Sequence, residues 1–212
     1  MNSNSIKKDI LKILGFNKSK SLKNASILIS GSSISQVISI VTAPIITRIY
    51  NPVDYGLLGI YMMVSSIIGV VSTMQYHTAI VVEKDDIIAS RLVLICLRIC
   101  VIISFIITIP IFFFNSEICR LLGDANLSFW LYLMPITVLL TGAYNTFLCW
   151  ANRQLMFNAM SFSRVFAAIT TPVFSILIGY FISGPLGLFT GLIIGQSISA
   201  IFLGKKIFRT IK

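Results

Sequence analysis

An apolar stretch over residues 43–82 limits what this chain can fold into more than any other feature. Two apolar runs are joined by a short polar turn that contains Arg48 and Asp54. The second run, Gly56–Val82, would be about 40 Å long as a helix, which exceeds the roughly 30 Å of bilayer hydrocarbon. A soluble fold could not cover that much apolar surface. The stretch therefore predicts a membrane hairpin.

The composition of the whole chain supports the same class. Of the 212 residues, 56% are hydrophobic and 11% are charged, whereas soluble domains carry about 25% charged residues. The prediction is an all-α polytopic membrane protein, because helices satisfy their own backbone groups in lipid. The net charge of +10 would suit a nucleic acid. The lysines and arginines cluster at the ends of apolar runs instead, so no nucleic-acid partner is expected.

Hydropathy and helix breakers predict six spans. They divide the chain into a basic cytoplasmic tail (1–24), a six-helix lobe (25–204) and a second basic tail (205–212). The first tail is either an interfacial amphipathic helix or a plain cytosolic segment. Trp130 and Trp150 bracket the fourth span, and their spacing of about 30 Å predicts one in each aromatic belt. The spans are Ser26–Thr47, Gly56–Val82, Leu92–Phe114, Ser128–Trp150, Val165–Ser183 and Leu186–Leu203.

The distribution of basic residues predicts the orientation. With both termini in the cytoplasm, the opposite side holds only Arg48 and Arg120. The cytoplasmic side then holds fourteen basic residues: Lys7, Lys8, Lys12, Lys18, Lys20, Lys23, Lys84, Arg91, Arg153, Arg164, Lys205, Lys206, Arg209 and Lys212.

Polar residues inside the spans are the candidates for function. In the first span, Gln36, Ser39 and Thr42 fall with neighbouring serines mostly on one helix face. That face either lines an aqueous cavity or allows close helix packing. Arg98 is the only charge well inside a span, and it either snorkels to the interface or meets an anionic substrate. His77 is the only histidine and fits an interfacial hydrogen-bonding role.

The last span carries Gly187, Gly191 and Gly195 at four-residue spacing, followed by Ser199. Such a row of small residues predicts a helix-packing face. No catalytic constellation, metal-ligand spacing or cofactor motif is visible in the sequence, so neither an enzyme nor a cofactor is predicted. The four cysteines suit packing rather than a disulfide framework or a zinc site.

Two stretches carry more specific information: residues 44–82 and residues 142–204. They resemble the N-terminal half of the polysaccharide biosynthesis (Wzx-type) flippases, in the superfamily that also holds the multidrug and toxin extrusion (MATE) carriers. One departure is Gln75-Tyr76-His77, where that family commonly reads Arg-Tyr-Glu. The matching residues are Pro44, Thr47, Arg48, Gly56, Trp150, Asn152, Arg153, Gln154, Ser163, Arg164, Gly191, Gly195 and Gln196.

The resemblance implies a carrier in the bacterial inner membrane that moves undecaprenyl-pyrophosphate-linked O-antigen or capsule units to the periplasmic leaflet. Family members enclose a cationic cavity between two lobes, which is consistent with an anionic substrate. Arg48 and Arg98 are then candidates for the cavity, and Arg153 and Arg164 either lie at its cytoplasmic mouth or fix topology. The candidates for its polar lining are Gln36, Ser39, Thr42, Tyr76 and His77.

Six spans supply only one lobe, so the expected partners are a second lobe or a second copy, along with the lipid-linked substrate, membrane lipids and other assembly proteins. The favoured interpretation is a truncated half-carrier, because Gly204–Lys212 looks like a connection to a seventh helix. A self-pairing half-size protein, a nonfunctional remnant or a docking subunit of the assembly machinery are alternatives. A membrane enzyme of polysaccharide assembly is less favoured, because the external connections are short.

Overall fold

The computed structural model describes residues 18–210, and every regular element in that range is helical. This confirms the predicted class of all-α polytopic membrane protein. The elements are α2 (Lys18–Ile49), α3 (Pro52–Val71), the 3₁₀-helix η1 (Tyr76–Thr78), α4 (Ala79–Val82), α5 (Asp86–Phe113), α6 (Asn115–Leu122), α7 (Leu127–Leu131), α8 (Met134–Arg153), α9 (Phe157–Phe181) and α10 (Leu186–Phe208).

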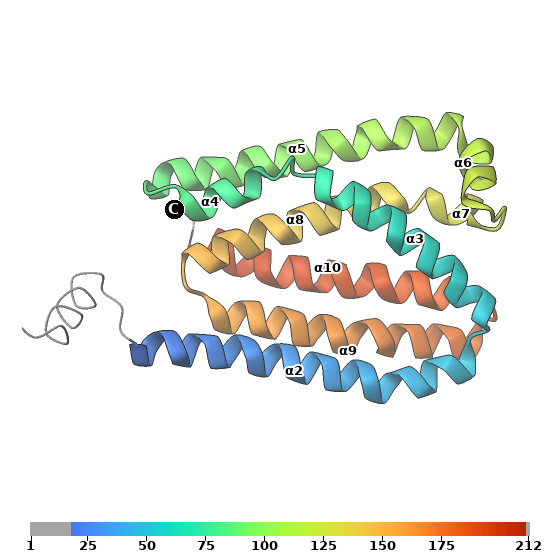
Figure 1. Ribbon diagram of the computed structural model, residues 1–212, viewed down its shortest axis with the longest axis horizontal. Helices are drawn as coiled ribbons and strands as arrows, with labels where there is room; N and C mark the ends of the chain where they lie inside the picture. The colour runs from blue at the N-terminus through green and yellow to red at the C-terminus, as the bar shows by residue number, and fades with distance from the viewer. Residues whose placement is uncertain (1–17, 211–212) are drawn as a thin grey trace, which may run out of the picture.

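The long helices lie side by side along one direction (Figure 1). Helix α8 is central and packs against α5 and α3 on one side and α10 on the other. Helix α9 lies between α10 and α2. Helix α2 contacts mainly α9, so most of its surface stays open.

Five of the described helices are long and apolar enough to cross a membrane: α2 from Leu22, α3, α5, α9 and α10. The sixth long helix, α8, falls outside that group although the sequence predicts a span there. It contains Asn145, Asn152 and Arg153, yet it holds more buried positions than α3 of the same length. Because α8 faces protein on several sides, it does not need the apolar composition of a lipid-facing helix.

The predicted continuous second span, Gly56–Val82, is wrong. Helix α3 ends at Val71, and the chain makes a turn, the short helix η1 and then α4. Met74 and Gln75 adopt positive φ angles of 46° and 59°, which a regular helix does not allow. At this break the buried Ser72 hydroxyl donates to the Gly69 carbonyl at 2.6 Å. Irregular backbone at membrane depth requires such contacts within the protein.

The connections between helices sort onto two ends of the bundle, as the six predicted spans require. The start of α2, the α4–α5 and α8–α9 connections and the end of α10 lie at one end (Figure 1). The α2–α3 connection, α6, α7 and the α9–α10 connection lie at the other. The orientation of the two ends in the membrane stays a prediction.

Most of the predicted tail 1–24 lies outside the described residues, and α2 already begins at Lys18.

Two clusters of buried side chains hold the helices together, one toward each end. One contains Trp150 with Ile80, Val93 and Leu203, and the other contains Trp130. The Trp130 ring stacks on Phe189 with centroids 4.0 Å apart. The two tryptophans are 6% and 2% exposed, so the prediction that they form lipid-facing belts is wrong. Their large apolar rings fill the core instead.

The glycine row of α10 packs against α9. A Cβ atom at Gly191 would lie 2.7 Å from the Thr171 carbonyl oxygen, and one at Gly195 would collide with the Thr171 side chain. The buried Tyr50 lies over the end of this interface and donates a 2.6 Å hydrogen bond to the Ser175 carbonyl. Burial raises the pKa of the Tyr50 hydroxyl above its ordinary value.

Candidate functional site

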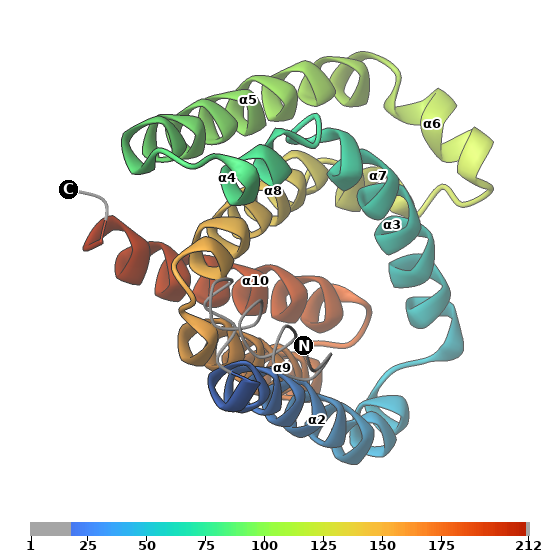
Figure 2. The ribbon, with the colours of Figure 1, turned by 60° about the vertical axis from the view of Figure 1, so that its left-hand side comes forward.

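A pocket of about 680 Å³ opens between α2, α3, α8, α9 and α10. Figure 2 shows α10 between α8, which lies above it, and the pair formed by α9 and α2, which lies below it. The walls of the pocket combine small or apolar side chains with a limited set of polar ones, as the walls of ligand pockets usually do. The polar lining residues are Ser32, Ser35, Gln36, Ser39, Thr42, Tyr55, Thr141, Tyr144, Arg164, Thr171, Gln196 and Ser199.

Helix α2 supplies one long wall. Its lining residues extend from Ser32 to Ile46, which is about 21 Å of helix. The hydroxyls of Ser39 and Thr42 donate to the carbonyls one turn back, at 3.0 and 2.8 Å. Because those donors are used within the helix, the hydroxyl oxygens present lone pairs to the pocket. This wall therefore suits a ligand that offers hydrogen-bond donors, such as a sugar.

Helix α9 brings Arg164 to the pocket. Its Nη1 donates to Ser32 Oγ at 2.9 Å, which holds the guanidinium between α2 and α9. Among the residues that the structure describes, Arg164 is the only charged side chain in the pocket lining, and no acid lies there with it. It forms no ion pair within residues 18–210. The remaining guanidinium donors can serve an anionic group of a ligand.

Helices α8 and α10 close the back of the pocket. The Tyr144 and Ser163 hydroxyls lie 3.2 Å apart, and Ser199 donates to the Ser163 carbonyl at 3.0 Å. Gln196 differs from these residues because its Oε1 atom is buried and has no hydrogen-bond partner within the described range. An unsatisfied buried acceptor calls for an explanation. Because Gln196 lines the pocket, a hydrogen-bond donor on a bound ligand would satisfy its Oε1 atom.

Sequence reasoning placed Gln196 in a motif but gave it no role. The Gly-x-x-x-Gly-Gln pattern could have indicated that Gln196 is partly buried. Its amide directly follows Gly195, a glycine at the contact between α10 and α9. Tyr144 and Thr171 were also missed, since their spans showed no polar face by spacing alone.

The structure brings together four of the predicted site residues, Gln36, Ser39, Thr42 and Arg164, in this pocket. Whether they bind a substrate stays a prediction. Gln36 and Arg164 come from neighbouring walls, because they belong to α2 and α9, which pack against each other.

The other predicted site residues lie outside the pocket. Arg48 is exposed in the last turn of α2, and Arg98 is exposed on α5, a helix that contributes nothing to the lining. Tyr76 and His77 lie in η1 at the break of the second span. Tyr76 is 52% exposed, and His77 is half-buried with its Nδ1 bonded to the Thr73 hydroxyl.

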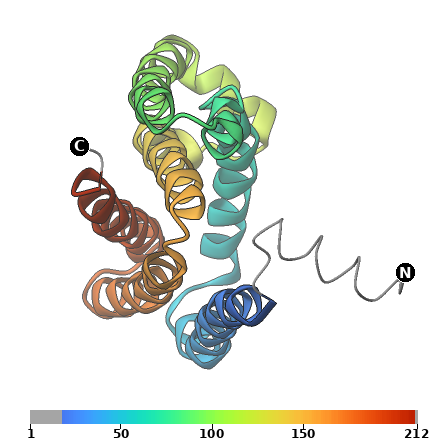
Figure 3. The same cartoon turned by 90° about the vertical axis from the view of Figure 1, so that its left-hand side faces the viewer.

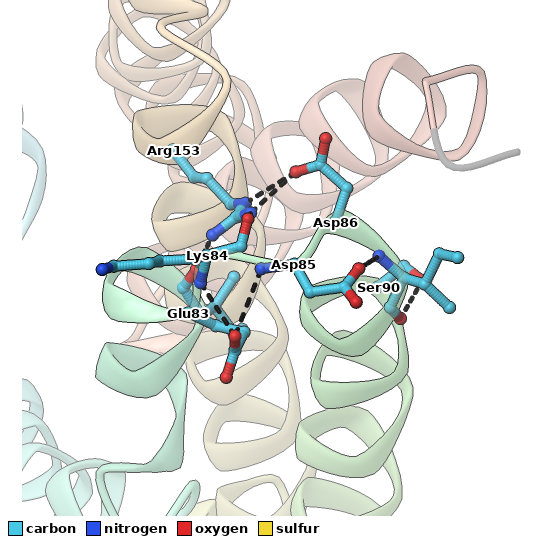
Figure 4. A network of polar contacts seen from close by, with 8 residues as sticks. Glu83, Lys84, Asp85, Asp86, Ser90 and Arg153 are labelled. Carbon is cyan, nitrogen blue, oxygen red and sulfur yellow. Dashed lines mark hydrogen bonds and ion pairs between the residues drawn. The ribbon is translucent and has the colours of Figure 1, made fainter.

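Arg153 has a different environment, shown in Figure 4. Its guanidinium contacts Asp86 Oδ1 at 2.7 Å and donates to the carbonyls of Ile80 and Lys84 at 3.3 and 3.1 Å. The Arg153 side chain is only 11% exposed, whereas that of Asp86 is 76% exposed. These bonds tie the end of α8 to the connection between α4 and α5. Arg153 therefore has a structural role: it fastens the end of α8 to the α4–α5 connection.

Within residues 18–210, no three His, Cys, Asp or Glu side chains come together in a group that could hold a metal ion. The chemistry available in the pocket is hydrogen bonding and charge.

Comparison with known proteins gives one match. A family model described as polysaccharide biosynthesis protein matches residues 45–207, well over half of the chain. No curated protein and no solved structure matches the chain. The helices and their apolar surfaces define a multi-pass membrane protein. The chain belongs to the family of polysaccharide biosynthesis proteins, and its work is therefore in the synthesis or export of polysaccharide.

Proposed function

We propose that this chain is one lobe of a carrier that translocates lipid-linked oligosaccharides, specifically undecaprenyl-pyrophosphate-linked O-antigen or capsule units, across the bacterial inner membrane. The observation that carries the proposal is Arg164, the single charged side chain of a polar pocket in a polysaccharide biosynthesis protein. A pyrophosphate needs a cation at membrane depth, where unpaired charge is costly. The acceptors along α2 suit the sugar hydroxyls.

The chemistry of the pocket favours transport over catalysis. Translocation requires reversible contacts to a substrate that leaves unchanged. The hydroxyls of α2, the Arg164 guanidinium and the Gln196 amide supply such contacts without a nucleophile and base in mutual reach. We further propose both termini in the cytoplasm, following the basic residues at that end of the bundle.

The pocket needs a further wall to enclose a substrate. Only 6% of the apolar window of α2 is buried, although α2 forms one side of the pocket. We propose that a second lobe, or a second copy of this chain, covers α2 and the pocket mouth. Alternating exposure of a midplane site between two lobes is the usual arrangement in carriers of this kind.

The test is surface polysaccharide in a bacterium that lacks its own flippase and carries the complete gene for this protein. Arg164→Gln removes the charge and keeps a polar side chain. Losing a charge-assisted hydrogen bond costs about 1.5–3 kcal/mol, so we expect export to fall by about ten- to a hundredfold at equal protein level in the membrane.

Arg120→Gln is the matched control. Arg120 is an exposed arginine that pairs only with Glu117 on α6, and its side chain is 81% exposed. This variant should export normally. Normal export by Arg164→Gln, with the protein present in the membrane, would remove the pocket from the transport route.

A further inference from the structure

A second groove lies between the ends of α8 and α10, at the end of the bundle where α10 finishes. It has a volume of about 630 Å³. Its apolar floor consists of Phe147 from α8 and Ile201 and Phe208 from α10. Gly204 lets α10 pack closely against α8 beneath the groove, because a Cβ at this position would lie 3.0 Å from the Phe147 ring. Lys205 and Arg209 form the rim.

The rim is strongly cationic. Lys205 and Arg209 are exposed, and neither forms an ion pair within the described range. Among residues 18–210, no acidic side chain lines the groove. The acids of the α4–α5 connection at this end are Glu83, Asp85 and Asp86; Asp86 is bonded to Arg153, and none of the three lines the groove. Lys206 adds a third charge nearby and lies 5.7 Å from the Phe202 ring centroid.

The groove lies away from the polar pocket. In Figure 3, α10 lies to one side of α8 and α3 lies to the other, with α2 below. The pocket takes its lining from α2, α3, α8, α9 and α10, and no residue lines both cavities. The groove is therefore separate from the polar pocket, and its lining residues Ile201, Lys205, Phe208 and Arg209 are exposed at the surface of the chain.

We propose that this groove binds an anionic phospholipid. The phosphate pairs with Lys205 and Arg209, and an acyl chain lies over Phe147 and Ile201. The arrangement matches such a lipid in both parts, because it places cations at the end of a span and apolar surface directly below them. Basic pockets between spans attract anionic headgroups, with each Lys or Arg contributing about 1 kcal/mol near the surface.

The charge and the floor together identify the occupant. A zwitterionic lipid would satisfy the apolar floor but carries no net charge for an uncompensated cationic rim. A free phosphate would satisfy the rim but would leave the apolar floor exposed. Only an anionic amphiphile uses both.

The experiment is native mass spectrometry of the detergent-purified full chain, titrated with dioleoyl phosphatidylglycerol and, separately, dioleoyl phosphatidylcholine. The two lipids share acyl chains and differ in charge. We expect preferential retention of phosphatidylglycerol. In the double variant Lys205→Gln/Arg209→Gln, its affinity should fall about ten- to thirtyfold, to the level of phosphatidylcholine.

The matched control is Lys84→Gln/Arg91→Gln, which removes two exposed charges from the same end of the bundle but outside the groove. Its preference for phosphatidylglycerol should equal that of the unchanged chain. An equal loss in both double variants would overturn the proposal, because it would mean attraction to the whole basic end. Equal retention of the two lipids by the unchanged chain would also overturn it.

Two further measurements test the apolar floor. Ile201 is 55% exposed, so Ile201→Trp fills the groove without disturbing the core, and it should weaken retention of phosphatidylglycerol. Unchanged retention would place the lipid elsewhere. Glycerol phosphate, which has the headgroup charge without the chains, should not compete; competition would identify a free phosphate site and overturn the lipid assignment.

Discussion

The arginines of this chain show how little a residue type says about its role. In the sequence, Arg153 follows the fourth predicted span, Arg164 directly precedes the fifth, and Arg98 lies inside the third. Arg164 enters a polar pocket, Arg153 bonds to backbone carbonyls and Asp86, and Arg98 stays exposed on α5. Hydropathy predicts where each residue lies along its helix. The direction of the side chain depends on which helices pack together, and no pattern within one span contains that information.

At the residue scale, Gln196 separates stability from ligand binding. Its buried Oε1 has no partner within residues 18–210, and an unsatisfied buried polar atom costs about 1–3 kcal/mol. Gln196→Leu should therefore leave the melting temperature in detergent unchanged or higher. The same variant should bind a lipid-linked oligosaccharide about five- to tenfold more weakly, because one neutral hydrogen bond is lost.

Gln75→Leu is the control for Gln196→Leu, since Gln75 is exposed outside the pocket. Its affinity should not change. A lower melting temperature together with unchanged affinity in Gln196→Leu would assign Gln196 a purely structural role.

At the element scale, the sequence predicts the positions of the long helices well but misses the break after Val71. No proline or glycine marks that break, and Met74 and Gln75 take positive φ angles without a residue type that favours them. Ser72 and Thr73 are fully buried at this break, and the elements that follow it, η1 and α4, pack against α5 and α8. The α7–α8 boundary does carry a local signal, because Pro135 lies in the first turn of α8.

The glycine row of α10 gives a stability prediction. Gly191→Ala places a methyl group against the Ser175 side chain and the Thr171 carbonyl, and overpacking of this kind costs about 1–3 kcal/mol. The melting temperature in detergent should fall. Gly59→Ala on α3 should raise it slightly, because a Cβ there meets nothing within 4 Å and alanine favours a helix over glycine by about 1 kcal/mol. Similar shifts in both variants would show that close packing on α9 is not the reason.

The Arg153 network gives a second prediction at this scale. Arg153→Gln leaves two carbonyls of the α4–α5 region without their partner and should destabilise the protein by about 2–3 kcal/mol. Asp86→Asn should cost at most about 1 kcal/mol, because Asp86 is largely exposed and exposed ion pairs contribute little. Thermal unfolding in detergent measures both. Equal losses would mean that the ion pair, rather than the carbonyl bonds, ties α8 to this connection.

For the molecule as a whole, the sequence predicts the class and the six long helices, and it leaves the polar face of α2 open between cavity lining and close helix packing. The serine, glutamine and threonine spacing on α2 is visible in the sequence, and that face does line the pocket. The other walls come mainly from α8, α9 and α10, and their contribution depends on helix packing. The buried tryptophans illustrate the same limit, because spacing suited aromatic belts whereas packing placed both rings in the core.

We propose that the pocket beside Arg164 binds the pyrophosphate-linked saccharide. The most direct test is the affinity of the purified complete protein for an undecaprenyl-pyrophosphate-linked oligosaccharide, measured in detergent for the unchanged protein, Arg164→Gln and Arg120→Gln. We expect Arg164→Gln alone to bind about ten- to a hundredfold more weakly, with a smaller difference at high salt. Equal affinity in all three proteins would contradict the account.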